Sequence, residues 1–162
     1  MTSETTEPGA FTAEIGLRWG DMDAYGHVNN VQYLRLLEES RITAFEQWFG
    51  GRGSHSMLEG GVIVARQEID YLRPLVYRTA GVRVDLRVSK VGGSSFDIGY
   101  EMRDPEGVGD QLYARAETTL AAFDLGDIVD EAWDPPVSRG ARLVSIVDDA
   151  IQHLAQASYV LG

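Results

Sequence analysis

The chain has 162 residues, 44% hydrophobic and 24% charged, a length and composition that fit one globular domain with a single hydrophobic core. Its 14 basic and 25 acidic residues give a formal net charge of -11, which repels nucleic acid and anionic membranes and disfavours a nucleic-acid role. It has no cysteine, which excludes disulfides, thiolate metal sites and a cysteine nucleophile.

The first ten residues, MTSETTEPGA, are polar and contain no basic residue. They lack the apolar core of a secretory signal, and no window of the chain approaches the roughly 18 apolar residues that a membrane-spanning helix needs. We therefore expect a soluble, cytoplasmic protein with a disordered leader over residues 1–10.

A strand and a long helix are predicted in the first third of the chain. Apolar and polar residues alternate from Phe11 to Trp19, which indicates a half-buried strand. A turn rich in Gly and Asp follows over residues 20–29, and apolar residues at spacings of three and four then predict a helix from Asn30 to Phe49. Ser40 and Arg41 interrupt its apolar stripe, so one section of this helix is expected to face a polar cavity.

Four more strands follow a glycine-rich loop over residues 50–61. We predict them over residues 61–72, 82–88, 96–103 and 111–123, with tight turns at 91–94 and 104–107. Their clean alternation favours antiparallel pairing with one solvated face. An antiparallel sheet wrapped around one helix is an α+β arrangement, and its edge strands invite pairing with a second subunit.

The C-terminal part, residues 125–162, is predicted to belong to the same domain. An acidic connector leads to apolar residues that follow a helical period from Leu143 to Leu154, which indicates a docked C-terminal helix. No internal repeat or second domain is visible.

The segment from Arg18 to Arg41 concentrates the residues with chemical potential. It carries two carboxylates, an imidazole and two amides where a turn enters a helix. A helix N-terminus presents free N–H groups that can polarise a carbonyl, and backbone donors near Asn29 and Asn30 are placed to do so. Asp23, a few residues upstream, is close enough to attack that carbonyl or to activate water beside it.

This arrangement suits a substrate with a good leaving group, because a carboxylate is only a weak base. Thiols have a pKa of about 8.5 and leave readily as thiolates, so a thioester needs neither a metal nor a strong acid. We therefore expect no metal and no cofactor. The motifs of α/β-hydrolases, P-loop proteins and dinucleotide-binding proteins are missing from the sequence.

Other interpretations of the same residues remain open. Asp21 and Asp23 can serve as ordinary turn residues, and Asn29 and Asn30 as helix caps. His27 is equally compatible with a packed or loop position. Two aspartates and one histidine can also bind a metal, but no further cluster of ligands supports such a site.

The motif D-x-D-x-x-G-H-V-N-N-x-x-Y-L at 21–34, continued by Glu38 and Arg41, resembles the hotdog-fold acyl-CoA thioesterases of the 4-hydroxybenzoyl-CoA thioesterase type. The segment at 71–74, Tyr-Leu-Arg-Pro, is a weaker second match. The resemblance covers most of the chain. It implies a hotdog domain over residues 11–124, with about five antiparallel strands around one central helix. It also implies hydrolysis of an acyl-CoA or acyl-carrier-protein thioester in a homodimer or homotetramer, with the ligand at the subunit interface.

Carried over by position, the resemblance makes Asp23 the nucleophile or general base and gives Asn30 the backbone N–H that binds the thioester carbonyl. His27 joins them as a positioning residue of the site wall. The substrate-binding positions that it implies are Asn29, Tyr33, Glu38, Tyr71 and Arg73, with Glu38 as a reserve catalytic acid. Two other functions stay open: a non-catalytic module that binds acyl-thioesters, and a dehydratase or hydratase of the same fold.

Overall fold

The computed structural model describes residues 9–49 and 62–122. The described elements, in chain order, are β1 (Ala10–Ile15), a short 3-10 helix η1 (Trp19–Asp21), α1 (Asn30–Phe49), β2 (Val62–Tyr71), β3 (Val82–Val91), β4 (Ser95–Arg103) and β5 (Leu112–Ala122). The predicted C-terminal helix lies outside the described residues, as do the acidic connector and most of the leader.

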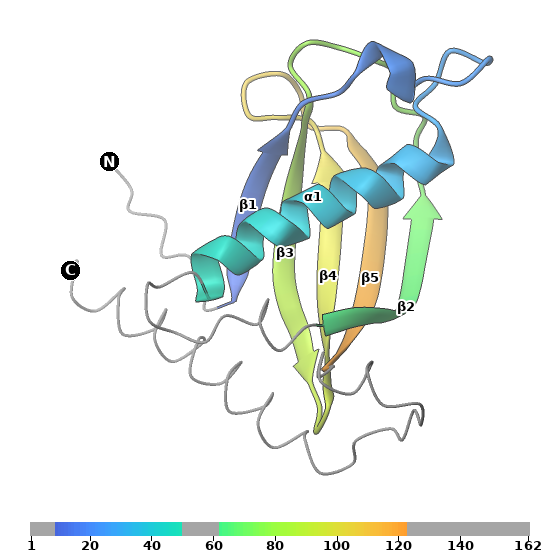
Figure 1. The fold of residues 1–162 in the computed structure, drawn as a ribbon. Coiled ribbons are helices and arrows are strands. Elements are labelled where there is room, and N and C mark those ends of the chain that lie inside the picture. The colour runs from blue at the N-terminus through green and yellow to red at the C-terminus, as the bar shows by residue number, and fades with distance from the viewer. Residues whose placement is uncertain (1–8, 50–61, 123–162) are drawn as a thin grey trace, which may run out of the picture.

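The strands form one five-stranded antiparallel sheet in the order β1-β3-β4-β5-β2. Figure 1 shows α1 lying across one face of this sheet, with β1 and β2 as its two edges. The predicted hotdog arrangement, an antiparallel sheet around one long helix, is confirmed. Within 9–49 and 62–122, no helix has both the length and the hydropathy required to cross a membrane.

The core fills the space between α1 and the sheet. Every second residue of β4 is buried, which places one face of that strand against the helix. Removing such side chains from water contributes about 1.5–3 kcal/mol each. Among the most buried apolar side chains are Leu36, Leu37, Val82, Val84, Phe96, Ile98 and Met102.

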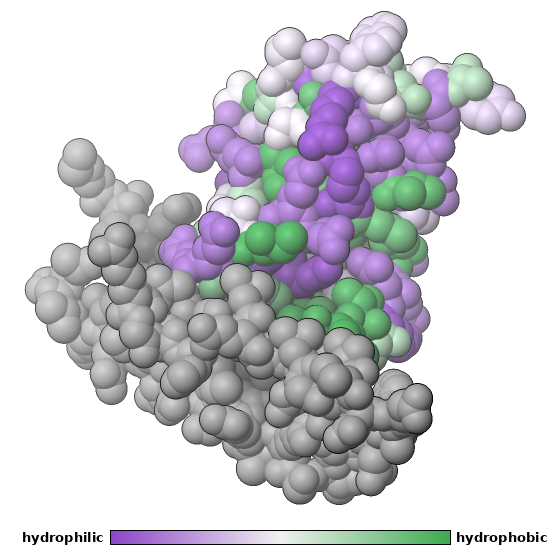
Figure 2. All heavy atoms as spheres, in the orientation of Figure 1, coloured by the Kyte–Doolittle hydropathy of each residue, from purple (hydrophilic) through white to green (hydrophobic). Residues whose placement is uncertain are grey.

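The opposite face of the sheet carries charged side chains that pair across neighbouring strands. Arg103 of β4 lies 3.3 Å from Asp85 of β3, and Arg115 of β5 lies 3.1 Å from Glu101 of β4. The outward face of α1 is also mainly hydrophilic, as Figure 2 shows. The predicted alternation between a buried and a solvated face is therefore confirmed for β3 and β4, whereas β2 is exposed or half-buried along its length.

The first strand is shorter than predicted. β1 ends at Ile15, which pairs with Val82, the first residue of β3. Gly81 precedes that pair with a φ of 68°, and a side chain there would lie 2.3 Å from the carbonyl oxygen of Ile15. The ladder therefore ends where its partner strand begins. Trp19 is 74% exposed in η1 and packs against the ring of Tyr77.

The polar interruption of α1 faces the sheet. Ser40 and Arg41 are both buried, and the Ser40 hydroxyl donates to the carbonyl of Leu37 at 2.7 Å. The Arg41 guanidinium donates to the Tyr100 hydroxyl of β4 at 3.3 Å and lies 3.9 Å from Glu38. In the described structure the interruption thus marks polar contacts within the core.

Candidate functional site

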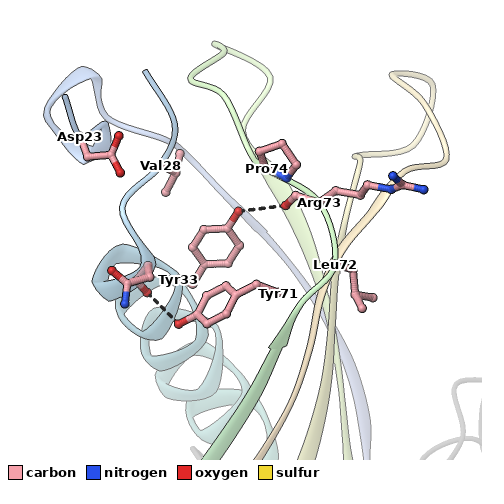
Figure 3. A pocket seen from close by; sticks show the side chains of 8 residues that line it. Asp23, Val28, Tyr33, Tyr71, Leu72, Arg73 and Pro74 are labelled. Carbon is pink, nitrogen blue, oxygen red and sulfur yellow. Dashed lines mark hydrogen bonds between the residues drawn. The ribbon is translucent and has the colours of Figure 1, made fainter. Parts of the chain in front are cut away.

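A cavity of about 300 Å³ lies at the N-terminal end of α1, beside the chain that leaves β2. Figure 3 shows that residues from two distant parts of the sequence line it. These segments are the two that carry the sequence motifs. The lining residues are Asp23, Val28, Asn30, Tyr33, Tyr71, Leu72, Arg73 and Pro74.

Asp21 fastens the loop before α1 to the helix. It is buried, and its Oδ2 accepts hydrogen bonds from the Arg35 guanidinium at 2.8 Å and from the backbone N–H of Arg18 at 2.7 Å. Its carbonyl also accepts the N–H of Asn29 at 2.8 Å. A buried carboxylate with these partners is a structural anchor.

Asp23 holds the next turn with one carboxylate oxygen. Oδ1 accepts the backbone N–H groups of Tyr25 at 2.9 Å and of His27 at 3.4 Å, which is the local bonding typical of aspartate in turns. Oδ2 has no hydrogen-bond partner in the part of the chain that the structure describes. In Figure 3 the Asp23 carboxylate points from its loop toward Val28, another residue that lines the cavity. One carboxylate oxygen thus holds the turn, and the other is left without a hydrogen bond on a residue that lines the cavity.

The N-terminus of α1 contributes a free backbone donor. The side-chain oxygen of Asn29 accepts the N–H of Val31 at 3.0 Å, which identifies Asn29 as the helix cap. The N–H of Asn30 donates to no acceptor among the residues described. Because this N–H belongs to the first helical residue, it adds the positive end of the helix dipole to the cavity wall.

Two tyrosines form an aromatic wall behind these groups. The rings of Tyr33 and Tyr71 meet edge to face, with centroids 5.1 Å apart. The Tyr71 hydroxyl donates to the carbonyl of Asn30 at 3.3 Å, and the Tyr33 hydroxyl donates to the carbonyl of Arg73 at 3.3 Å (Figure 3). Burial raises the pKa of Tyr33, and the neighbouring Tyr71 adds to the rise despite a hydrogen bond from the Leu75 backbone that opposes it.

Arg73 stands at the edge of the cavity with an exposed side chain. Within the described ranges its guanidinium forms no ion pair. Figure 3 shows the side chain extending away from Asp23. It can therefore meet an anionic part of a ligand at the rim while the reacting part lies deeper.

Five of the eight predicted site residues therefore line the cavity, namely Asp23, Asn30, Tyr33, Tyr71 and Arg73. Asn29 lies next to it as the helix cap. The other two predicted positions lie elsewhere: His27 is exposed on the loop, and the Glu38 side chain is 60% exposed beside Arg41.

Three lining residues, Val28, Leu72 and Pro74, were not assigned from the sequence. All three lie within the two matched motifs. They were not assigned because apolar side chains carry no chemical group that points to a site. In residues 9–49 and 62–122, no group of three or more His, Cys, Asp or Glu side chains is placed to hold a metal ion.

The chemical capacity of this site follows from Asp23 and Asn30. These two residues line the same cavity from the two ends of a short loop, and they bring to it a carboxylate and an unpaired backbone N–H. A carbonyl carbon placed between them has a nucleophile or base on one side and a donor for its oxygen on the other. Such geometry suits acyl transfer or hydrolysis.

Comparison with known families gives a match over most of the chain. The model of the thioesterase-like superfamily matches residues 17–140. This range includes both segments that line the cavity.

Two known proteins resemble the chain in sequence. The uncharacterized protein YsmA of Bacillus subtilis is 31% identical over 99 residues, which cover 60% of this chain and 64% of YsmA. The chain thus spans slightly under two thirds of that relative. The long-chain acyl-CoA thioesterase FadM of Escherichia coli is 30% identical over 118 residues, which cover 69% of this chain and 82% of FadM.

A solved structure shows the same similarity in three dimensions. A thioesterase from Thermus thermophilus, complexed with coenzyme A and zinc, superimposes with a TM-score of 0.63 at 26% identity. The superposition covers 87% of this chain and 96% of that one.

Proposed function

The chain belongs to the thioesterase-like superfamily, and from this we propose that it is an acyl-CoA thioesterase, which hydrolyses the thioester to a free acid and a thiol. The observation that carries the proposal is the pair formed by the open Oδ2 of Asp23 and the free N–H of Asn30 at one cavity. Relatives named as a long-chain acyl-CoA thioesterase and as a thioesterase complexed with coenzyme A support the substrate class.

Asp23 starts the reaction by one of two routes. Its carboxylate either adds to the thioester carbon and expels the thiolate, leaving an anhydride that water cleaves, or it removes a proton from a water molecule that adds to that carbon directly. In both routes the developing negative charge on the carbonyl oxygen is stabilised by the N–H of Asn30. The thiolate leaves without strong acid assistance because its conjugate acid has a pKa of about 8.5.

The remaining predicted residues receive supporting roles. Tyr71 and Tyr33 form the aromatic wall along which the acyl-thioester lies. Arg73 binds a phosphate of coenzyme A or of the phosphopantetheine arm of an acyl-carrier protein, since a local cation is needed where the net charge is -11. His27 and Glu38 have no observed contact with the cavity, so their proposed parts in positioning and substrate binding rest on the motif alone.

We also propose that the working unit is a homodimer or homotetramer located in the cytoplasm. β2 is an edge of the described sheet and ends at Tyr71, so a second subunit that pairs with this edge extends the cavity wall. Ile63 and Val64 of β2 are exposed in the single chain, as an interface strand requires.

The test is a panel of acyl-CoA and acyl-carrier-protein thioesters of increasing chain length, with release of the free thiol measured by a thiol reagent. We expect turnover of at least one chain-length class. Tight binding of an acyl-CoA without thiol release would instead favour a non-catalytic binding module. Consumption of an enoyl-CoA, followed by absorbance, would favour a hydratase. Either result would contradict the proposal.

A further inference from the structure

The hydroxyl of Tyr33 joins the two walls of the cavity. Tyr33 is 3% exposed on the first turn of α1, and residues 72–75, which leave β2, form the facing segment that we call the strap. The Tyr33 hydroxyl donates to the carbonyl of Arg73 at 3.3 Å and accepts the N–H of Leu75 at 3.1 Å. One phenol oxygen therefore links the helix to two points of the strap.

A third hydrogen bond joins the strap to the loop before the helix. The N–H of Val28 donates to the carbonyl of Leu75 at 2.7 Å. On its other side the strap is held by β5, because the carbonyl of Tyr113 accepts the N–H groups of Leu72 at 2.8 Å and of Arg73 at 3.1 Å. The bonds of Val28 and Tyr33 thus tie the strap to the segment that carries the proposed catalytic pair.

We propose that Tyr33 is a positioning residue for catalysis, whose hydroxyl sets the separation between the helix N-terminus and the strap. The helix side carries the N–H of Asn30 and follows the loop of Asp23, while Tyr71 and Arg73 belong to the other side. The family resemblance implies that Tyr33 binds substrate. In this proposal the Tyr33 ring still lines the cavity, but its hydroxyl bonds to the protein backbone and not to the ligand. The inference rests on the proposed thioesterase function.

The bonding pattern requires a neutral phenol. A hydroxyl that donates to one carbonyl and accepts one N–H needs its proton, and a phenolate can only accept. Burial among apolar neighbours raises the pKa of Tyr33, so the proton stays in place at neutral pH. Its neighbour Tyr71 donates to Asn30 instead and does not compete for the same acceptor.

The decisive variant is Tyr33→Phe, which keeps the ring against Tyr71 and removes only the oxygen. With the two hydrogen bonds of the Tyr33 hydroxyl removed, the strap is held less precisely against the helix. The thioester is then misaligned with Asp23 and Asn30, so kcat should fall about ten- to a hundredfold, as small misplacements of reacting groups do. KM should remain close to the native value, because the hydroxyl is not proposed to contact substrate. The matched control is Tyr100→Phe, which removes another buried tyrosine hydroxyl, one bonded to Arg41 away from the cavity.

Both variants are expected to melt at a lower temperature, since each leaves a buried polar group without its partner. Kinetics are therefore measured well below the melting temperature, with sucrose added to favour the folded state if the Tyr33→Phe protein needs it. A fall in kcat for Tyr33→Phe alone supports the positioning role. Native kcat in the folded Tyr33→Phe protein, or a raised KM at unchanged kcat, overturns it while leaving the thioesterase function intact. A native protein that cleaves no acyl-thioester overturns the function and this role together.

Discussion

Asp23 combines two tasks that the sequence alone presents as alternatives. Its Oδ1 accepts two backbone N–H groups of its own loop, and its Oδ2 accepts no hydrogen bond from the described residues. The loop bonds fix the carboxylate in direction, which is what a nucleophile or base needs if it is to meet the substrate without reorganising. The residue that holds the turn is thus also the one proposed as catalytic.

Arg73 gives a prediction at this scale. Arg73→Ala should raise KM for acyl-CoA about three- to tenfold, because an exposed cation that binds a phosphate contributes modestly. It should leave KM unchanged for an acyl N-acetylcysteamine thioester, which has no phosphate. Arg87→Ala is the matched control, since Arg87 is an exposed arginine on β3. An equal rise in KM for both thioesters would show that Arg73 does not bind phosphate.

At the scale of elements, the sequence predicted well those boundaries that are marked by neighbouring residues, such as a helix cap or a glycine. α1 begins at Asn30 and ends at Phe49 as expected, since Asn29 caps it and two glycines follow it. The end of β1 was missed because it depends on where β3 begins, a partner distant in sequence. The cavity depends on β2 lying at the sheet edge beside β5, a strand order that periodicity does not contain.

The turn after β4 is a second feature that the sequence predicts only in part, because the partners of Asp104 lie outside that turn. The sequence predicts only a turn at 104–107, whereas Asp104 is buried and accepts hydrogen bonds from the Tyr113 hydroxyl at 2.7 Å and the Gln111 N–H at 2.9 Å. The Arg78 guanidinium lies 2.6 Å away. Burial by itself would raise the pKa of Asp104, but these three partners outweigh it and hold the pKa below its usual value.

This network predicts a pH-dependent stability. Because the native state favours the ionised Asp104, its contribution is fully present above the unfolded-state pKa of about 3.9 and is lost as the pH falls below it. Asp104→Asn should lower the free energy of unfolding by about 1–3 kcal/mol at pH 7, measured by urea denaturation. The difference from the native protein should shrink toward acid pH.

Asp110→Asn is the control for that experiment, since Asp110 is an exposed carboxylate of the same loop. We expect it to leave the free energy of unfolding nearly unchanged. A difference between Asp104→Asn and the native protein that is constant from neutral to acid pH would contradict the assigned role of the charge.

At the scale of the whole molecule, the edge strand β2 is the surface on which we expect a second subunit to pair. Among the described strands β2 pairs only with β5, and its apolar residues Ile63 and Val64 are 40% and 44% exposed. Edge strands with apolar side chains are sites of strand pairing between chains. The proposed dimer uses this property.

We predict a dimer or tetramer for the native protein by light scattering, and a shift toward monomer for Val64→Lys, because a lysine on an edge strand opposes pairing. Val108→Lys tests the effect of the charge alone, since Val108 is similarly exposed, at 50%, on a loop between β4 and β5. A native protein that is monomeric at all concentrations would exclude the dimer. A Val64→Lys protein with native mass would exclude β2 as its interface.

We propose that a carboxylate oxygen of Asp23 reacts at a thioester whose carbonyl is held by the N–H of Asn30. Asp23→Asn tests it most directly, since the amide keeps an oxygen for the N–H groups of Tyr25 and His27 and removes only the charge that faces the cavity. On the best substrate of the acyl-thioester panel, kcat of the variant should fall about a hundredfold or more, with circular dichroism and melting temperature close to native. A folded Asp23→Asn protein that releases thiol at the native rate would contradict the claim.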